Sequence, residues 1–213
     1  MRQHVLKGKE EIIKEYGAYI VQAPKERKGC WNSLFSNADA PLYIEIGSGK
    51  GQFITQNALL HPDRNYLACE GAINIYPRIL QKLGENRLSN ALLISEYIIN
   101  PADYFEPGEL AGLYLNFSDP WPKTRDAHRR LTYVDKLNAY KEILCGGATL
   151  EFKTDNDELF EFSLRQAELA RLPLAFVTRD LHSSEIASEN VETEYEQKFS
   201  ALGKNINYFK IVF

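Results

Sequence analysis

Apolar residues along the chain fall into short strand-like runs that alternate with longer segments of helical spacing. Seven runs rich in β-branched, leucine and aromatic residues predict strands. They lie at residues 42–46, 65–70, 91–94, 110–117, 148–152, 174–178 and 206–213. Apolar positions three and four apart predict helices at 9–21, 52–60, 132–144 and 157–172, with another of about a dozen residues from near 73. Because strand and helix alternate five times, the pattern predicts a doubly wound, mostly parallel seven-stranded α/β sheet.

The end of the chain departs from this alternation. The linker between the last two predicted strands holds at most a short helix, around residues 194–202, so we expect an antiparallel strand at the edge of the sheet. The 213 residues fit a single domain with an N-terminal extension over about residues 1–40. A linker as long as 180–207 is often a binding loop.

The first predicted strand runs directly into a glycine-rich turn, in the sequence LYIEIGSGKG at residues 42–51. Its glycines stand at alternating positions: Gly47, Gly49 and Gly51. A turn of this kind that opens a helix forms a nucleotide cradle in open α/β sheets, although it also occurs without a ligand. Gln52 stands where a dinucleotide fingerprint has its third glycine. Glu45 would repel a pyrophosphate but attract ammonium and sulfonium charges, so the turn favours S-adenosylmethionine over NAD.

Polar residues follow other predicted strands at the same edge of the sheet, where open α/β folds bind their ligands. Glu70 ends the second strand, nineteen residues after Gly51, and suits either hydrogen bonds from ribose hydroxyls or a place at the start of the next helix. The fourth strand leads to Asp119 in a loop stiffened by two prolines, with Trp121 between them as a flat amphipathic plate. Asp155 follows the fifth strand and either caps the next helix or points into the cleft.

Four cations follow the proline loop within eight residues: Lys123, Arg125, Arg129 and Arg130. Beside a nucleotide-fold cleft such a run suits a phosphate clamp for a nucleic acid, although runs of this kind are commonly solvated surface. The formal net charge of −4 argues weakly against a nucleic-acid partner, but much of the acid lies later in the chain. We therefore give more weight to the local patch than to the total charge.

The remaining composition argues against several other classes of protein. No apolar run approaches the length of about 18 residues that a membrane span needs, so no membrane contact is expected. The charged N-terminus lacks the apolar core of a signal peptide, and the three separate cysteines are typical of reduced thiols, so a cytoplasmic location is expected. Because the sequence has neither a Cys-x-x-Cys pair nor a histidine cluster, no metal is expected.

Taken together, these segments resemble the bacterial tRNA (guanine-N7-)-methyltransferases of the TrmB type. The matching motifs occur in order over most of the chain: KG-x-W from Lys28, EIGSGKGQF from Glu45, NFSDPWPK from Asn116, RRLT from Arg129, FKTDN from Phe152 and TEYEQKF from Thr193. The glycine motif is shared by all methyltransferases of this fold, whereas the later motifs together are specific to the family. The resemblance implies a Rossmann-like class I S-adenosylmethionine-dependent fold and methyl transfer to N7 of a guanine in the variable loop of tRNA.

The resemblance also implies roles for individual residues. It implies that the glycine turn, Glu45, Glu70 and Asp119 bind the cofactor and that Asp119 is the active-site acid. It implies RNA contacts for residues 125–130, and guanosine contacts for a further set: Lys123, Asp155, Thr193, Glu194, Tyr195 and Glu196. One position departs from the family pattern, because Tyr97 stands where the family places Asp or Asn to hold the adenine. Tyr97 would then stack or hydrogen-bond, unless the neighbouring Glu96 serves with a one-residue shift.

Three other functions share parts of this pattern. A methyltransferase acting on an exocyclic amine of another RNA or protein substrate carries a loop similar to NFSDPWP, but has no reason to carry the RRLT and TEYE segments. An NAD-linked oxidoreductase is disfavoured by Gln52 and Glu45, and Tyr97 leaves open a non-catalytic RNA-binding module of the same fold. Both a monomer and a homodimer are compatible with the sequence.

Overall fold

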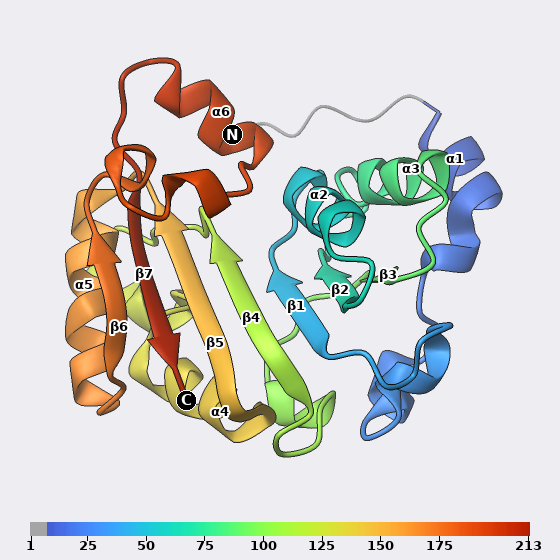
Figure 1. The fold of residues 1–213 in the computed structure, drawn as a ribbon, viewed down its shortest axis with the longest axis horizontal. Helices are drawn as coiled ribbons and strands as arrows, with labels where there is room; N and C mark the ends of the chain where they lie inside the picture. The colour runs from blue at the N-terminus through green and yellow to red at the C-terminus, as the bar shows by residue number, and fades with distance from the viewer. Residues whose placement is uncertain (1–7) are drawn as a thin grey trace.

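The computed structural model describes residues 8–213, and its centre is a seven-stranded sheet in the order β3-β2-β1-β4-β5-β7-β6 (Figure 1). The strands are β1 (Leu42–Ile46), β2 (Asn65–Cys69), β3 (Ala91–Ile94), β4 (Leu110–Asn116), β5 (Leu144–Thr154), β6 (Leu174–Thr178) and β7 (Asn207–Val212). The α-helices are α1 (Lys9–Tyr16), α2 (Gln52–Leu60), α3 (Pro77–Glu85), α4 (Val134–Ile143), α5 (Asp157–Leu169) and α6 (Glu194–Ser200). None of the helices described is long and apolar enough to cross a membrane.

The pairing of the strands confirms the predicted α/β fold. Strands β1 to β5 pair with one another in parallel, as crossover connections through helices require. The expected antiparallel pairing occurs at one side of the sheet, where the edge strand β6 pairs with β7. Strand β7 lies between β6 and β5 and is antiparallel to both.

The two faces of the sheet are covered by different helices. On β2, Tyr66 and Ala68 belong to one apolar cluster while Leu67 and Cys69 belong to the other, because successive side chains of a strand point to opposite faces. Helices α2 and α3 contribute buried residues to the first cluster, and α4 and α5 contribute theirs to the second. The carboxyl ends of β1, β4 and β5 meet at one edge, over which α6 lies in Figure 1.

One predicted boundary is wrong. The strand predicted over residues 148–152 begins earlier in the structure, before Gly146 and Gly147, because α4 ends at Ile143 and β5 starts at once with Leu144. The glycines lie within β5, where the pairing with β4 shifts register between Leu110 and Gly112. Gly147 has a φ of 83°. A strand irregularity of this kind needs residues that tolerate left-handed backbone, which explains the glycines.

The N-terminal extension packs against the sheet domain, and its first seven residues lie outside the part described. The predicted helix over 9–21 is shorter in the structure, because Ile20 leaves the helical path and bridges to Leu93 on β3. Trp31 is fully buried and donates its indole N–H to the Tyr104 carbonyl at 2.7 Å. On the outer side, the Tyr16 ring lies where a Cβ on Gly84 of α3 would stand.

Candidate active site

The glycine turn joins β1 to α2 and is held in shape by its own backbone. Gly47, Gly49 and Gly51 have φ values of 83°, 54° and 81°, a left-handed region that side chains disfavour. The Ser48 hydroxyl donates to the Glu45 carbonyl at 2.9 Å and accepts from the Cys69 amide at 3.1 Å. The predicted glycine turn therefore joins strand to helix in a fixed conformation at the carboxyl end of β1, and we call it the glycine cradle.

Glu45 lies beside this cradle with 1% of its surface exposed. Its Oε1 accepts a hydrogen bond from Asn116 Nδ2 at 2.8 Å, whereas Oε2 is buried with no hydrogen-bond partner among residues 8–213. Burial raises the pKa of Glu45 to about 7, although the Asn116 hydrogen bond and the Lys153 ammonium act in the opposite direction. An unpaired carboxylate oxygen at a glycine turn fits a cationic ligand group, because such a group would satisfy the charge.

Glu70 is tied to the cradle rather than to the following helix. Its carboxylate accepts from the amides of Gly49 at 3.1 Å and Ala72 at 3.0 Å, while α3 begins later at Pro77. The alternative that Glu70 caps a helix is therefore wrong. Burial raises the pKa of Glu70, and the nearby Asp119 carboxylate raises it further.

Tyr97 lies at the same edge, with its ring against the backbone that follows Glu70. A Cβ placed on Gly71 would stand 2.5 Å from the ring, so only a glycine leaves it this position. Tyr97 is 64% exposed, and its pKa is raised by partial burial and by the carboxylates of Glu70 and Asp119. An aromatic face, two carboxylates and the glycine cradle are thus gathered at one end of the sheet.

Asp119 is exposed on the proline-rich loop after β4, and this loop is strained. Phe117 and Trp121 both have positive φ, at 51° and 40°, which costs free energy for a non-glycine residue. Arg130 holds the loop by donating from Nε to the Pro120 carbonyl at 2.9 Å and from a terminal nitrogen to the Trp121 carbonyl at 3.0 Å.

The four basic residues after the loop therefore divide into two kinds. Arg130 is half-buried and the Arg129 guanidinium lies 3.5 Å from the centre of the Trp121 ring, so both brace the loop. Lys123 and Arg125 are exposed, and the only ion pair of Arg125 among the described residues is a 3.9 Å contact with its neighbour Asp126. The run is therefore more than a charged patch, because Arg130 stabilises the proline-rich loop.

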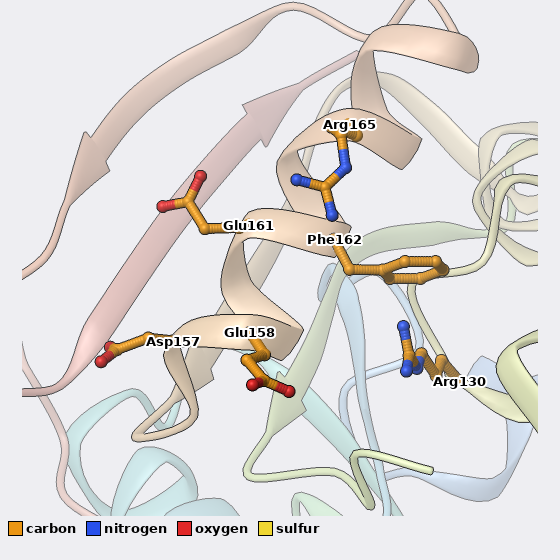
Figure 2. A pocket seen from close by; sticks show the side chains of 6 residues that line it. All are labelled: Arg130, Asp157, Glu158, Glu161, Phe162 and Arg165. Atoms are coloured by element: carbon orange, nitrogen blue, oxygen red, sulfur yellow. The ribbon is translucent and has the colours of Figure 1, made fainter. Parts of the chain in front are cut away.

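An open hollow of about 460 Å³ adjoins Arg130 and lies outside the cradle. Figure 2 shows Phe162 of α5 between Arg130 and Arg165, with three carboxylates on the same helix. The Arg130 guanidinium stands 4.2 Å from the Phe162 ring centre. No residue of the glycine turn lines this hollow.

Asp155 does not cap α5, although it immediately precedes the residue that does. The cap is its neighbour Asn156, whose side chain accepts from the Leu159 amide at 2.8 Å. The Asp155 carboxylate instead accepts from the Tyr195 hydroxyl at 3.4 Å. The Tyr195 ring stacks on Phe199 and lies 4.9 Å from the Phe117 ring centre, which links α6 to the loop that carries Asp119.

The segment before α6 is fastened by Glu196, which is fully buried. Its carboxylate accepts from Lys153 Nζ at 2.8 Å and from Asn190 Nδ2 at 2.7 Å, and it lies 2.8 Å from the His182 ring. Thr193 and Glu196 also form a capping box at the start of α6. Burial alone would raise the pKa of Glu196, but the Lys153 ammonium and the hydrogen bonds outweigh it and hold the pKa below its usual value. This position differs from the direct guanosine contact that the resemblance implies for Glu196.

Sequence reasoning missed Asn116 and Lys153, although both lie inside motifs that it quoted. They share a face of the sheet with Glu45, at the carboxyl ends of three neighbouring strands. Polar residues at the buried end of a strand were the available signal, since burial without partners is costly. Among the residues described, no three His, Cys, Asp or Glu side chains group in a way that could hold a metal ion.

Comparison with known proteins shows the family to which the chain is similar. The family model described as "Putative methyltransferase" matches residues 39–209. A tRNA (guanine-N(7)-)-methyltransferase of Geobacillus thermodenitrificans is 46% identical over 197 residues, which cover 92% of this chain and 90% of that protein. Its counterpart in Bacillus subtilis is 43% identical over 197 residues, with 92% of each chain covered.

Solved structures support the fold alone. One described as an antibiotic-related methyltransferase has a TM-score of 0.65 at 15% identity and covers 93% of this chain and 98% of its own. The family is shown by the matching model and by relatives above 40% identity over nine-tenths of the chain. The chain belongs to the tRNA (guanine-N(7)-)-methyltransferase family.

Proposed function

We propose that this protein transfers a methyl group from S-adenosylmethionine to N7 of a guanine in the variable loop of tRNA. The observation that carries the proposal is the buried, unpaired Oε2 of Glu45 beside the glycine turn. The proposal extends to a cytoplasmic protein, since that is where an unmodified tRNA would be met.

The cradle suits the parts of this cofactor in turn. Glu45 would pair with the ammonium of its methionine part, and Glu70 would exchange the Gly49 amide for the ribose hydroxyls. Tyr97 would offer its exposed ring to the adenine by stacking, in place of the hydrogen bond that an Asp or Asn makes. The cofactor supplies a methyl group activated by the sulfonium charge.

The chain's own contribution to the reaction is positioning and charge. Guanine N7 carries a lone pair and no proton, so no base is needed to form the nucleophile. Asp119 would hold the base edge and stabilise the positive charge that methylation places on the purine. Asp155 and Tyr195 would hold the other side of the nucleoside, while Lys123 and Arg125 meet the phosphates.

The test incubates the protein with labelled S-adenosylmethionine and an unmodified tRNA transcript, and maps the methylated base. We expect 7-methylguanosine in the variable loop, and none in a matched transcript that carries adenine at that position. Label on an exocyclic amine, on protein or nowhere would refute the proposal. Asp119→Asn should reduce the turnover number far more than it weakens tRNA binding, and equal losses in both would remove its assigned role.

A further inference from the structure

Lys153 is a buried ammonium that the proposed reaction does not use. Its side chain is 4% exposed and, within the part of the chain that the structure describes, makes three polar contacts, all with the segment 190–196. Nζ donates to Glu196 Oε2 at 2.8 Å, to the Val191 carbonyl at 2.8 Å and to Asn190 Oδ1 at 2.9 Å. Three hydrogen bonds use every donor that a lysine has, so nothing remains for a substrate.

The segment that Lys153 holds carries Tyr195, to which the proposed function gives a contact with the substrate nucleoside. Tyr195 is 42% exposed, next in the chain to Glu196, and its hydroxyl lies 3.4 Å from Asp155. Because Asp155 follows Lys153 by two residues at the end of β5, one strand end fixes both partners of this pair. Fixing Glu196 therefore fixes where Tyr195 stands.

Between these contacts the same segment is attached more loosely, at Glu192 and Glu194. Glu194 pairs with Lys82 of α3, and Gln52 Nε2 donates to the Glu192 carbonyl at 3.4 Å. Both members of the Lys82–Glu194 pair are about one-third exposed. Exposed pairs hold a segment weakly, whereas a buried and fully bonded pair holds it in one geometry.

We propose that Lys153 is a positioning residue for the substrate nucleoside, acting through Glu196 to place Tyr195 beside Asp155. This inference rests on the proposed function for its activity readout. Glu196 shares this positioning role and does not contact the guanine, because its carboxylate is fully buried and already accepts from Lys153 and Asn190.

The test compares Lys153→Met, Glu196→Gln and the double variant with Lys210→Met as the matched control. Lys210 lies on the adjoining strand β7, and its one ion pair with the described residues is a 3.8 Å contact with Glu151, at a side-chain exposure of 37%. For each folded variant, kcat and KM for the tRNA transcript are measured together with the affinity for S-adenosylhomocysteine. The affinity is measured above the pKa of Glu45, because Lys153 also acts on that carboxyl.

We expect Lys153→Met to lower kcat/KM for tRNA by about tenfold to a hundredfold, the effect of a small misplacement, with the cofactor affinity unchanged. Lys210→Met should behave as the wild type. The double variant should lose no more than the worse single variant, because both changes break one device. Wild-type kinetics for Lys153→Met, or losses that multiply in the double variant, would overturn the proposal.

Hydrogen exchange supplies a readout independent of activity. Amides of residues 191–197 should exchange faster in Lys153→Met, while those of β5 and α3 keep wild-type rates. Unchanged exchange in that segment would overturn the proposal even if activity fell. A wild-type protein that leaves guanine unmethylated would refute the proposed function, and the exchange experiment would then still decide whether Lys153 anchors the segment.

Discussion

Replacing Glu45 by glutamine measures how much the ionised Glu45 carboxylate destabilises the ligand-free protein. Glutamine keeps the volume and the acceptor for Asn116 Nδ2, but it cannot ionise. Its amide nitrogen would lie where Oε2 has no partner, which costs about 1–3 kcal/mol at every pH. The informative quantity is therefore the change in unfolding free energy with pH, in which this constant cost cancels.

The magnitude follows from the pKa. The pKa of the Glu45 carboxyl is 4.5 in the unfolded, solvated chain and about 7 in the folded protein. The folded state therefore binds the proton more tightly than the unfolded state does. Stability from this group is complete below 4.5 and is lost as the pH rises to about 7. At 1.36 kcal/mol per unit, the loss is about 3 kcal/mol. Glu45→Gln should lack this loss and gain that amount relative to the wild type.

Urea unfolding between about pH 5 and pH 8 measures this slope in both proteins. Glu151→Gln is the matched control, because Glu151 is partly exposed on β5, which β4 separates from β1, and pairs with Lys210. It should follow the wild-type dependence. The affinity for S-adenosylhomocysteine should rise with pH up to about 7 in the wild type, since its ammonium favours the ionised carboxylate, and stay low and flat in Glu45→Gln. Parallel pH slopes of stability in wild type and variant would refute the reasoning.

Three further outcomes can be checked directly. Arg130→Ala should lower methylation of tRNA while leaving the salt dependence of tRNA binding unchanged, because its guanidinium braces two loop carbonyls; a flatter salt slope in filter binding would show a phosphate contact instead. Tyr97→Phe should keep the cofactor affinity and Tyr97→Ala should weaken it by about tenfold in calorimetry, as loss of one stacking ring predicts, and equal affinities would remove the stacking role. Trp31→Ala should destabilise the protein by about 3–5 kcal/mol in urea unfolding, since a fully buried ring is lost. A loss below about 1 kcal/mol would mean that the extension packs independently of the core.

The strands and the glycine cradle were predictable because their signals are local. The run from Leu42 to Ile46 shows strand residues and its turn glycines within ten positions. Glu45 was equally visible, since an acid inside an apolar strand contradicts the pattern around it. Asp155 and Asn156 could not be separated, because either side chain can cap a helix and only the path of the backbone decides between them.

The roles of Arg130 and Glu196 could not be predicted from the sequence. Lys153 and Glu196 are 43 residues apart, and no spacing rule connects a strand end to a helix that follows a long linker. In the sequence, a basic run of this kind indicates a positively charged patch. In the structure, Arg130 donates instead to two backbone carbonyls, which lie within reach only once the loop has folded. In both cases a residue with an apparent contact role turns out to hold another residue in place.

The packing of the N-terminal helix α1 depends on the absence of a Cβ at Gly84, because the Tyr16 ring occupies that space. Helix α1 has no buried residue of its own, so it depends on the surface that α3 offers. Alanine at position 84 is a better helix former than glycine and would strengthen α3 while filling the space of the tyrosine ring. At position 84, a residue that stabilises α3 therefore weakens the packing of α1 against it. A single substitution at this position is thus a way to detach α1 from α3 without shortening the chain.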